Sequence, residues 1–177
     1  QAIVDLGVEI IREDERLEST VVPRPWLTVL SRGGIAAAVD LTAGQPKYDP
    51  VGVTTDGMAD VANSLYAIRE LVFDRDELSF HELQEVLRAD WRGQENLRQR
   101  VLNKLPRFGQ DDPAVNAVAR DVAARFAGCF ARHRTFYGGP FLPLIFGVST
   151  SLIRGRAPKT GATASGRRAG GPLAMRS

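Results

Sequence analysis

Residues 138–152 have the sequence GGPFLPLIFGVSTSL, and this stretch decides the fold class of the chain. Gly138, Gly139 and Pro140 stop the helical pattern that precedes them. Residues 141–152 are then rich in apolar and β-branched side chains, which is typical of a buried strand. We expect one clear buried strand here. Because the remaining pattern is mostly helical, the sequence predicts an α/β fold.

A helix is predicted to lead into this strand. Asp112 followed by Pro113 is a standard helix start, since the acid can cap the first turn and proline suits the first helical position. One apolar face of this helix is formed by Val115, Val118, Val122, Phe126 and Cys129.

Further upstream, residues 58–72 have the clearest helical period. Their apolar positions recur at steps of three and four: Met58, Val61, Leu65, Ile68 and Val72. Thr55 or Asp56 is expected to cap the first turn. Ser79 and Glu82 have the spacing of a capping box, which predicts the start of a further helix.

Proline and glycine residues are expected to interrupt regular secondary structure in other parts of the chain. Residues 42–55 contain two prolines and two glycines and are expected to form no regular structure. A short helix that carries Leu97 and Val101 is expected to end at Pro106.

The N-terminal part of the chain is less well defined by its pattern. Residues 2–18 have an apolar period that fits either a strand or a helix. Pro25 can begin a helix that reaches Asp40, provided that Gly33 and Gly34 do not interrupt it.

Residues 154–177 carry six basic residues and no acidic one. Composition alone predicts disorder for residues 155–177, which consist largely of glycine, alanine, serine, threonine and arginine. A basic segment on a more acidic body indicates an anionic partner, or acidic partners elsewhere in a larger protein. Nucleic acid is disfavoured as that partner, because no aromatic residue lies in the segment to stack on bases.

Composition also excludes several classes of protein. The chain has 44% hydrophobic and 25% charged residues, as a folded globular domain does. No apolar run is long enough to span a membrane, and the first residues do not resemble a signal peptide. Cys129 is the only cysteine, so no internal disulfide can form, and we expect a cytoplasmic protein.

Three chemical sites can be considered, and each has a simpler explanation. Cys129 and His133 share a helical face, but the cysteine continues an apolar stripe and is better explained as a small buried side chain. A metal site is not expected, because the chain has only two histidines. Residues 161–168 nearly match a phosphate-binding loop, but two arginines, Arg167 and Arg168, replace its lysine and hydroxyl.

Several short motifs together resemble one family. They are DLT at 40–42, YDPVG at 48–52, ADVANSL at 59–65, NKLPRFG at 103–109, GGPF at 138–141, TGAT at 160–163 and GRRAGGPLA at 166–174. Their order and spacing resemble those of glycyl radical enzymes of the pyruvate formate-lyase type. The resemblance is best over residues 35–174, and it implies that residues 1–177 form part of a single pyruvate formate-lyase-like domain.

The resemblance implies a slice of a ten-stranded α/β barrel that encloses a dry active site, with residues 155–177 as an ordered loop. It implies a radical relay in the full-length enzyme, from a glycyl radical to a cysteine thiyl that abstracts hydrogen from a small-molecule substrate. The products would be those of bond cleavage or acyl transfer, as in dehydratases, decarboxylases and formate acetyltransferase. The radical would be installed by an S-adenosylmethionine iron–sulfur activating enzyme, in an anaerobic, homodimeric protein that binds no further cofactor.

The radical residues themselves are not expected in this segment. The family's cysteine motif has no counterpart in residues 1–34, and its Arg-Val-x-Gly-Tyr glycine motif has none before Ser177. We therefore expect the chain by itself to be inactive and to contain no catalytic residue. The resemblance assigns Phe146, Val148 and Thr150 to a wall of the substrate pocket, because alternate residues of a strand share a face. The same alternation would also fit a plain barrel core.

A second hypothesis comes from a different class of function. The chain could be a stand-alone derivative that has lost catalysis and acts as a binding or structural protein, docking to an anionic partner through its basic segment.

Overall fold

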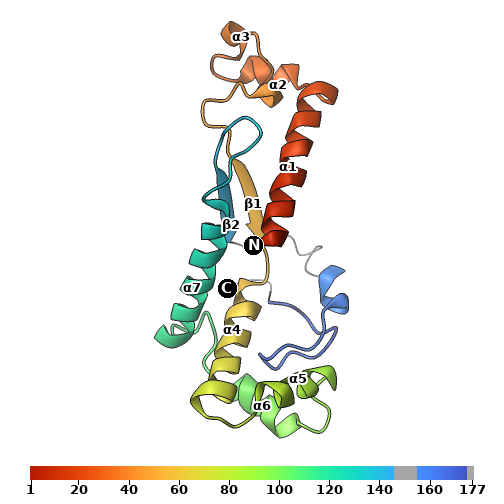
Figure 1. Cartoon of the computed structure of the whole chain (residues 1–177), viewed down its shortest axis with the longest axis vertical. Coiled ribbons are helices and arrows are strands. Elements are labelled where there is room, and N and C mark those ends of the chain that lie inside the picture. The colour runs from red at the N-terminus through yellow and green to blue at the C-terminus, as the bar shows by residue number, and fades with distance from the viewer. Residues whose placement is uncertain (146–154, 175–177) are drawn as a thin grey trace. The chain divides into compact units, whose positions relative to one another are not determined.

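The computed structural model describes residues 1–145 and 155–174 (Figure 1). The chain divides into two compact units. The first unit contains residues 1–53 and 125–144. The second contains residues 54–124 together with the chain from residue 145 onward. Helix α7 and strands β1 and β2 each contribute residues to both units.

The first unit combines helices with a pair of strands. Its elements, in chain order, are α1 (Ala2–Val21), α2 (Pro25–Leu30), α3 (Gly34–Ala37), the 3₁₀ turn η1 (Leu41–Ala43), most of β1 (Val51–Thr55), the end of α7 (Pro113–Phe130) and most of β2 (Phe141–Ile145). The two strands form a parallel two-stranded sheet. The sequence pattern of residues 2–18 fitted either a strand or a helix, and in the structure these residues are helical, as part of α1.

Helices α1 and α7 pack on one face of this sheet. Val8 of α1, Phe130 of α7 and Phe141 of β2 are buried together in the core of the first unit. The half-buried side chains around them are Val4, Ile11, Val51, Val53, Phe126 and Cys129. The aromatic rings of Phe126 and Phe130 meet edge to face, with centroids 5.1 Å apart.

Strand β1 corrects the prediction that residues 42–55 form no regular structure. Pro50 lies just before the strand, where its missing N–H is not needed, and Val51 donates its N–H to the carbonyl of Pro140 at 3.1 Å. Val51 and Val53 point toward the helices, whereas Gly52 between them is exposed. Pro50 before the strand and Gly52 within it are therefore compatible with a strand, because pairing with β2 stabilises it.

The glycine pair does interrupt the helix that begins at Pro25. Helix α2 ends at Leu30, and Gly33 takes a left-handed conformation with φ of 81° before α3 begins at Gly34. The conformation at Gly33 is one that residues with side chains rarely adopt.

The second unit is helical. It contains α4 (Met58–Ile68), a single π-helical turn η2 (Arg69–Asp74), α5 (Phe80–Arg88), α6 (Glu95–Lys104), most of α7 and the short 3₁₀ turn η3 (Ala157–Lys159). Its core is built around buried Leu71, Leu83, Trp91, Val101 and Ala164.

Two predicted side-chain caps are confirmed and one is wrong. Ser79 and Glu82 form the capping box of α5, and Asp112 accepts hydrogen bonds from two backbone N–H groups at the start of α7. For α4, however, the capping residue is Gly57, with no side-chain bond from Thr55 or Asp56.

The buried face of α4 also differs from the predicted apolar face. Val61 and Leu65 are exposed, while the buried side chains are Ala59, Ala62, Asn63, Tyr66 and Ala67. Asn63 can be buried because its Oδ1 accepts the N–H of Phe108 at 2.8 Å. Small and hydrogen-bonded residues thus form the packed side of this helix.

Composition alone was wrong about residues 155–174, since this segment forms an ordered loop, as the family resemblance implied. Ala164, Ser165, Gly166 and Arg167 are all buried. The guanidinium of Arg167 donates to four backbone carbonyls of the same loop, those of Thr160, Gly161, Arg168 and Gly171. Because carbonyls rather than amides converge here, the loop does not form the amide cradle of a phosphate-binding loop.

Candidate functional site

The sheet of the first unit has one face that no helix of that unit covers. Leu142 and Leu144 of β2 lie on this face and are 45% and 37% exposed. Gly52 of β1 lies next to Leu144, because a Cβ placed on Gly52 would be 3.1 Å from the Leu144 side chain. The face is therefore apolar, although it is accessible to solvent in this chain.

A glycine turn sets the position of β2. Gly139 donates its N–H to the buried Oγ1 of Thr135 at 2.8 Å, and its carbonyl accepts the N–H of Thr135 at 2.9 Å. Arg134 and Pro140 form an isolated antiparallel bridge just before the strand. These contacts therefore fix the conformation of the turn that leads into β2.

The predicted wall residues Phe146, Val148 and Thr150 lie outside the described residues. Strand β2 is described as far as Ile145, so the structure describes only the beginning of the predicted strand 141–152.

Two carboxyl groups lie near the glycine turn, and burial perturbs both. Glu15 of α1 accepts the N–H of Phe136 at 2.8 Å. Burial raises the pKa of Glu15, and the nearby negative charge of Asp49 raises it further. Burial also raises the pKa of Asp49, whose Oδ2 has no hydrogen-bond partner among the described residues.

Two residues at the carboxyl end of β1, Thr55 and Asp56, were predicted from the sequence only as helix caps. Thr55 Oγ1 and Asp56 Oδ1 are buried and have no hydrogen-bond partner in the described part of the chain. Buried polar groups normally have partners, so these two atoms are candidates to bind a ligand or another segment. The spacing of apolar residues in the sequence did not indicate that these two side chains are buried.

The alternative chemical sites receive no support from the geometry. Cys129 is half-buried and packs at the edge of the apolar core of the first unit, as a small apolar side chain does. His133 Nε2 lies 2.9 Å from Asp5 Oδ1, and Arg132 binds the same carboxylate. Within residues 1–145 and 155–174, no group of three or more potential ligands is placed to hold a metal ion.

Comparison with known proteins identifies the family. Residues 1–155 match the family described as pyruvate formate lyase-like. The chain belongs to this family of glycyl radical enzymes.

Several relatives of this glycyl radical enzyme segment are dehydratases. It is 30% identical to (2S)-3-sulfopropanediol dehydratase of Klebsiella oxytoca over 85% of the chain and 18% of that protein. It is 34% identical to the probable dehydratase YbiW of Escherichia coli strain K12 over 79% of the chain and 18% of that protein. The segment therefore spans about a fifth of the length of these relatives.

Solved structures agree with the family assignment. A glycyl radical enzyme from Archaeoglobus fulgidus matches 98% of the chain and 22% of its own length, with a TM-score of 0.86 and 29% identity. The predicted fold class is thus confirmed, since the segment matches a piece of the glycyl radical enzyme barrel. No helix in the described part of the segment is long and apolar enough to cross a membrane.

Proposed function

We propose that this chain is a wall segment of a glycyl radical dehydratase, and that its bare sheet face lines the substrate cavity. The observation that carries this proposal is the asymmetry of the β1–β2 sheet. Helices α1 and α7 cover one face, while Gly52, Leu142 and Leu144 lie on the other. In an α/β barrel the helices lie outside the strands, so the face without helices points to the barrel interior.

Phe146, Val148 and Thr150 extend this wall in the proposal. Along a strand, alternate residues point to the same face, and these three continue the alternation of Leu142 and Leu144. A mostly apolar wall excludes water, and among these three side chains only the hydroxyl of Thr150 would be able to bind a substrate hydroxyl.

The activity proposed for the whole protein is loss of water from a small hydroxylated substrate. The glycyl and cysteine radical residues would come from parts of the protein outside this segment, and they would supply hydrogen abstraction. The residues of this segment hold the carbon skeleton and keep the cavity dry. Dehydration is favoured over acyl transfer, because the named relatives are dehydratases.

The proposed partners follow from the same assignment. They are a small-molecule substrate, an activating enzyme that uses S-adenosylmethionine and an iron–sulfur cluster, and a second copy in a cytoplasmic, anaerobic homodimer. Cleavage of C–C or C–N bonds and formate acetyltransferase activity are further reactions that the family resemblance leaves open.

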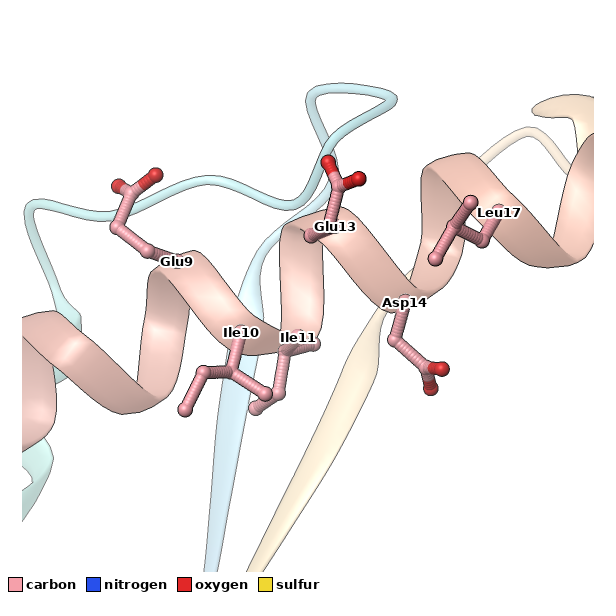
Figure 2. A pocket seen from close by; sticks show the side chains of 6 residues that line it. All are labelled: Glu9, Ile10, Ile11, Glu13, Asp14 and Leu17. Carbon is pink, nitrogen blue, oxygen red and sulfur yellow. The ribbon is translucent and has the colours of Figure 1, made fainter.

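The outer side of α1 supports the view that this segment packs within a larger protein. Figure 2 shows the six residues of α1 that line a pocket, which are Glu9, Ile10, Ile11, Glu13, Asp14 and Leu17. The exposed apolar side chains of this helix are Ile3, Leu6, Ile10, Leu17 and Val21. An exposed apolar stripe of this length is typical of a surface that another element covers.

The first experiment is to sequence the gene on both sides of this segment. The proposal expects a reading frame that continues upstream into a glycine-flanked cysteine motif and downstream into Arg-Val-x-Gly-Tyr. A start codon and a stop codon directly flanking Gln1 and Ser177 would contradict it. The alternative, a stand-alone binding protein without radical chemistry, would then be favoured.

The second experiment tests the wall in the whole protein. After anaerobic activation, Leu144→Asn should leave the glycyl radical signal in electron paramagnetic resonance unchanged and lower kcat/KM for dehydration by about tenfold or more. Leu30→Asn is the matched control, because Leu30 is exposed on α2 and lies outside the sheet. Equal activity of the two variants would show that the bare sheet face does not line the cavity.

A further inference from the structure

The second unit contains a pocket of about 440 Å³ that is rich in arginine. It lies between α4, α6, the segment that follows α6, and the loop 166–174. Four arginines line it, Arg98, Arg107, Arg167 and Arg168. Asp60 is the only acidic residue among those of the described chain that line it.

Two of these arginines have carboxylate partners, and Arg168 also lies 3.8 Å from Asp90. Arg98 and Arg168 both bind the carboxylate of Glu95, at 2.7 and 2.8 Å. Hydrogen bonds from Gln99 and from Arg168 lower the pKa of Glu95 to about 2, so this carboxylate is charged at neutral pH. These two arginines are therefore committed to structural ion pairs.

The other two arginines have no carboxylate partner in the part of the chain that the structure describes. Arg107 donates one hydrogen bond, from Nη1 to the carbonyl of Ser165 at 3.3 Å. Arg167 donates only to backbone carbonyls. Asp60 also lines the pocket, where its Oδ2 accepts the N–H of Ala174, and it forms no ion pair with a described arginine, so the arginines outnumber the carboxylate in this lining.

Arg167 is the stronger indication of a ligand. Its side chain belongs to a residue that is only 8% exposed, and its Nε is buried with no hydrogen-bond partner among the described residues. A buried guanidinium without a counter-charge is costly, as is a buried donor without an acceptor. A negatively charged group in the pocket would supply the missing counter-charge.

We propose that this pocket binds an oxyanion, such as a phosphate, sulfate or carboxylate group, with Arg107 and Arg167 as its cationic partners. Guanidinium groups recognise such anions by charge-assisted hydrogen bonds. The pocket volume is in the range of small-molecule sites and exceeds what a single inorganic ion needs. The anion comes either from a free small molecule or from an acidic side chain of the longer protein.

This inference does not rest on the proposed dehydratase function. The pocket belongs to the second unit, whereas the proposed wall is formed by the sheet of the first unit. Failure of either proposal therefore leaves the other intact.

Titration of the 177-residue chain with sodium phosphate tests the proposal, with chloride adjusted to keep the ionic strength constant. The arginine Nε–H signals in ¹H–¹⁵N spectra should shift in a saturable way. Arg107→Gln should weaken binding by about tenfold or more. Arg12→Gln is the control, because Arg12 is an exposed arginine of α1 that pairs with Glu9, and it should bind phosphate as the wild type does.

Arg107→Lys covers the case in which the glutamine variant unfolds, since lysine keeps the charge but loses the two-pronged geometry and should also weaken binding. Absence of a saturable shift with phosphate, sulfate and acetate would overturn the proposal. So would binding of long polyanions such as single-stranded nucleic acid without binding of phosphate, because that pattern indicates an extended surface.

The source of the anion is decided in the longer protein that contains this chain. If phosphate still binds there with the same dependence on Arg107, the ligand is a free anion. If phosphate no longer binds and Arg107→Gln lowers the Tm more than Arg12→Gln does, an acidic side chain of the protein occupies the pocket.

Discussion

Gly139 lies directly against the backbone carbonyl of Asp49. A Cβ atom placed on Gly139 would come within 1.9 Å of that oxygen and 3.0 Å of the carbonyl oxygen of Tyr48. This contact joins two motifs that lie far apart in the sequence, YDPVG at 48–52 and GGPF at 138–141. It brings β1 and β2 together at the start of their parallel pairing.

Gly139→Ala should therefore destabilise the chain by about 3 kcal/mol or more, because backbone atoms cannot move aside as a side chain can. Urea denaturation followed by circular dichroism measures this change. Gly128→Ala is the matched control, since a Cβ on that helical residue meets no atom within 4 Å. It should stabilise the chain by about 0.5–1 kcal/mol. Similar free energies of unfolding for the two variants would contradict the contact.

Leu71→Ala should remove about 2–5 kcal/mol from the stability of the second unit. Leu71 is 1% exposed and packs in the core with Trp91 and Leu83, so the smaller side chain leaves a cavity. Phe73 lies on the same π-helical turn but is 70% exposed, and Phe73→Ala should change stability by about 0.5 kcal/mol or less. Fluorescence of the tryptophans during urea unfolding reports the difference. If Phe73→Ala costs more than Leu71→Ala, the assignment of this core is wrong.

Asp40 should stabilise the chain in a pH-dependent way. Its carboxylate accepts bonds from the backbone and side chain of Thr42 and from the N–H of Arg24, and these lower its pKa from 3.8 to about 2. Between these two values the unfolded chain binds the proton and the folded chain does not, so stability rises with pH. The stability advantage of wild type over Asp40→Asn should be full above the unfolded pKa and disappear as pH falls through about 2. An advantage that does not change with pH would show that Asp40 acts without its charge.

Asp49 should show the opposite dependence. Burial raises its pKa, so the folded chain binds the proton more tightly than the unfolded chain does. Asp49→Asn should therefore stabilise the protein at neutral pH, and this gain should fade as pH falls below the raised pKa. Asparagine is suitable here, because Asp49 has a φ of 36° and asparagine tolerates left-handed backbone. Thermal melts across pH measure the gain, and a loss of stability at neutral pH would contradict the assigned cause.

Some features of this chain could be read from its sequence because they depend on neighbouring residues. The capping box of Ser79 and Glu82 and the helix start at Asp112 and Pro113 act within one helical turn, and both are present in the structure. The family could also be recognised from the sequence, because the order and spacing of its short motifs do not depend on tertiary contacts. The glycine turn at 138–140 correctly marked the start of a strand.

Other features were decided by tertiary structure. Strand β1 forms in a stretch full of breakers because β2 provides its pairing partner, and α4 buries Ala62 and Asn63 rather than Val61 and Leu65 because its neighbours meet that side. The loop of residues 155–174 is ordered because Arg167 donates hydrogen bonds to four of its backbone carbonyls. Composition does not reveal this arrangement. Local patterns therefore indicated the starts of α5 and α7, whereas packing between distant segments decides which faces of the helices and strands are buried.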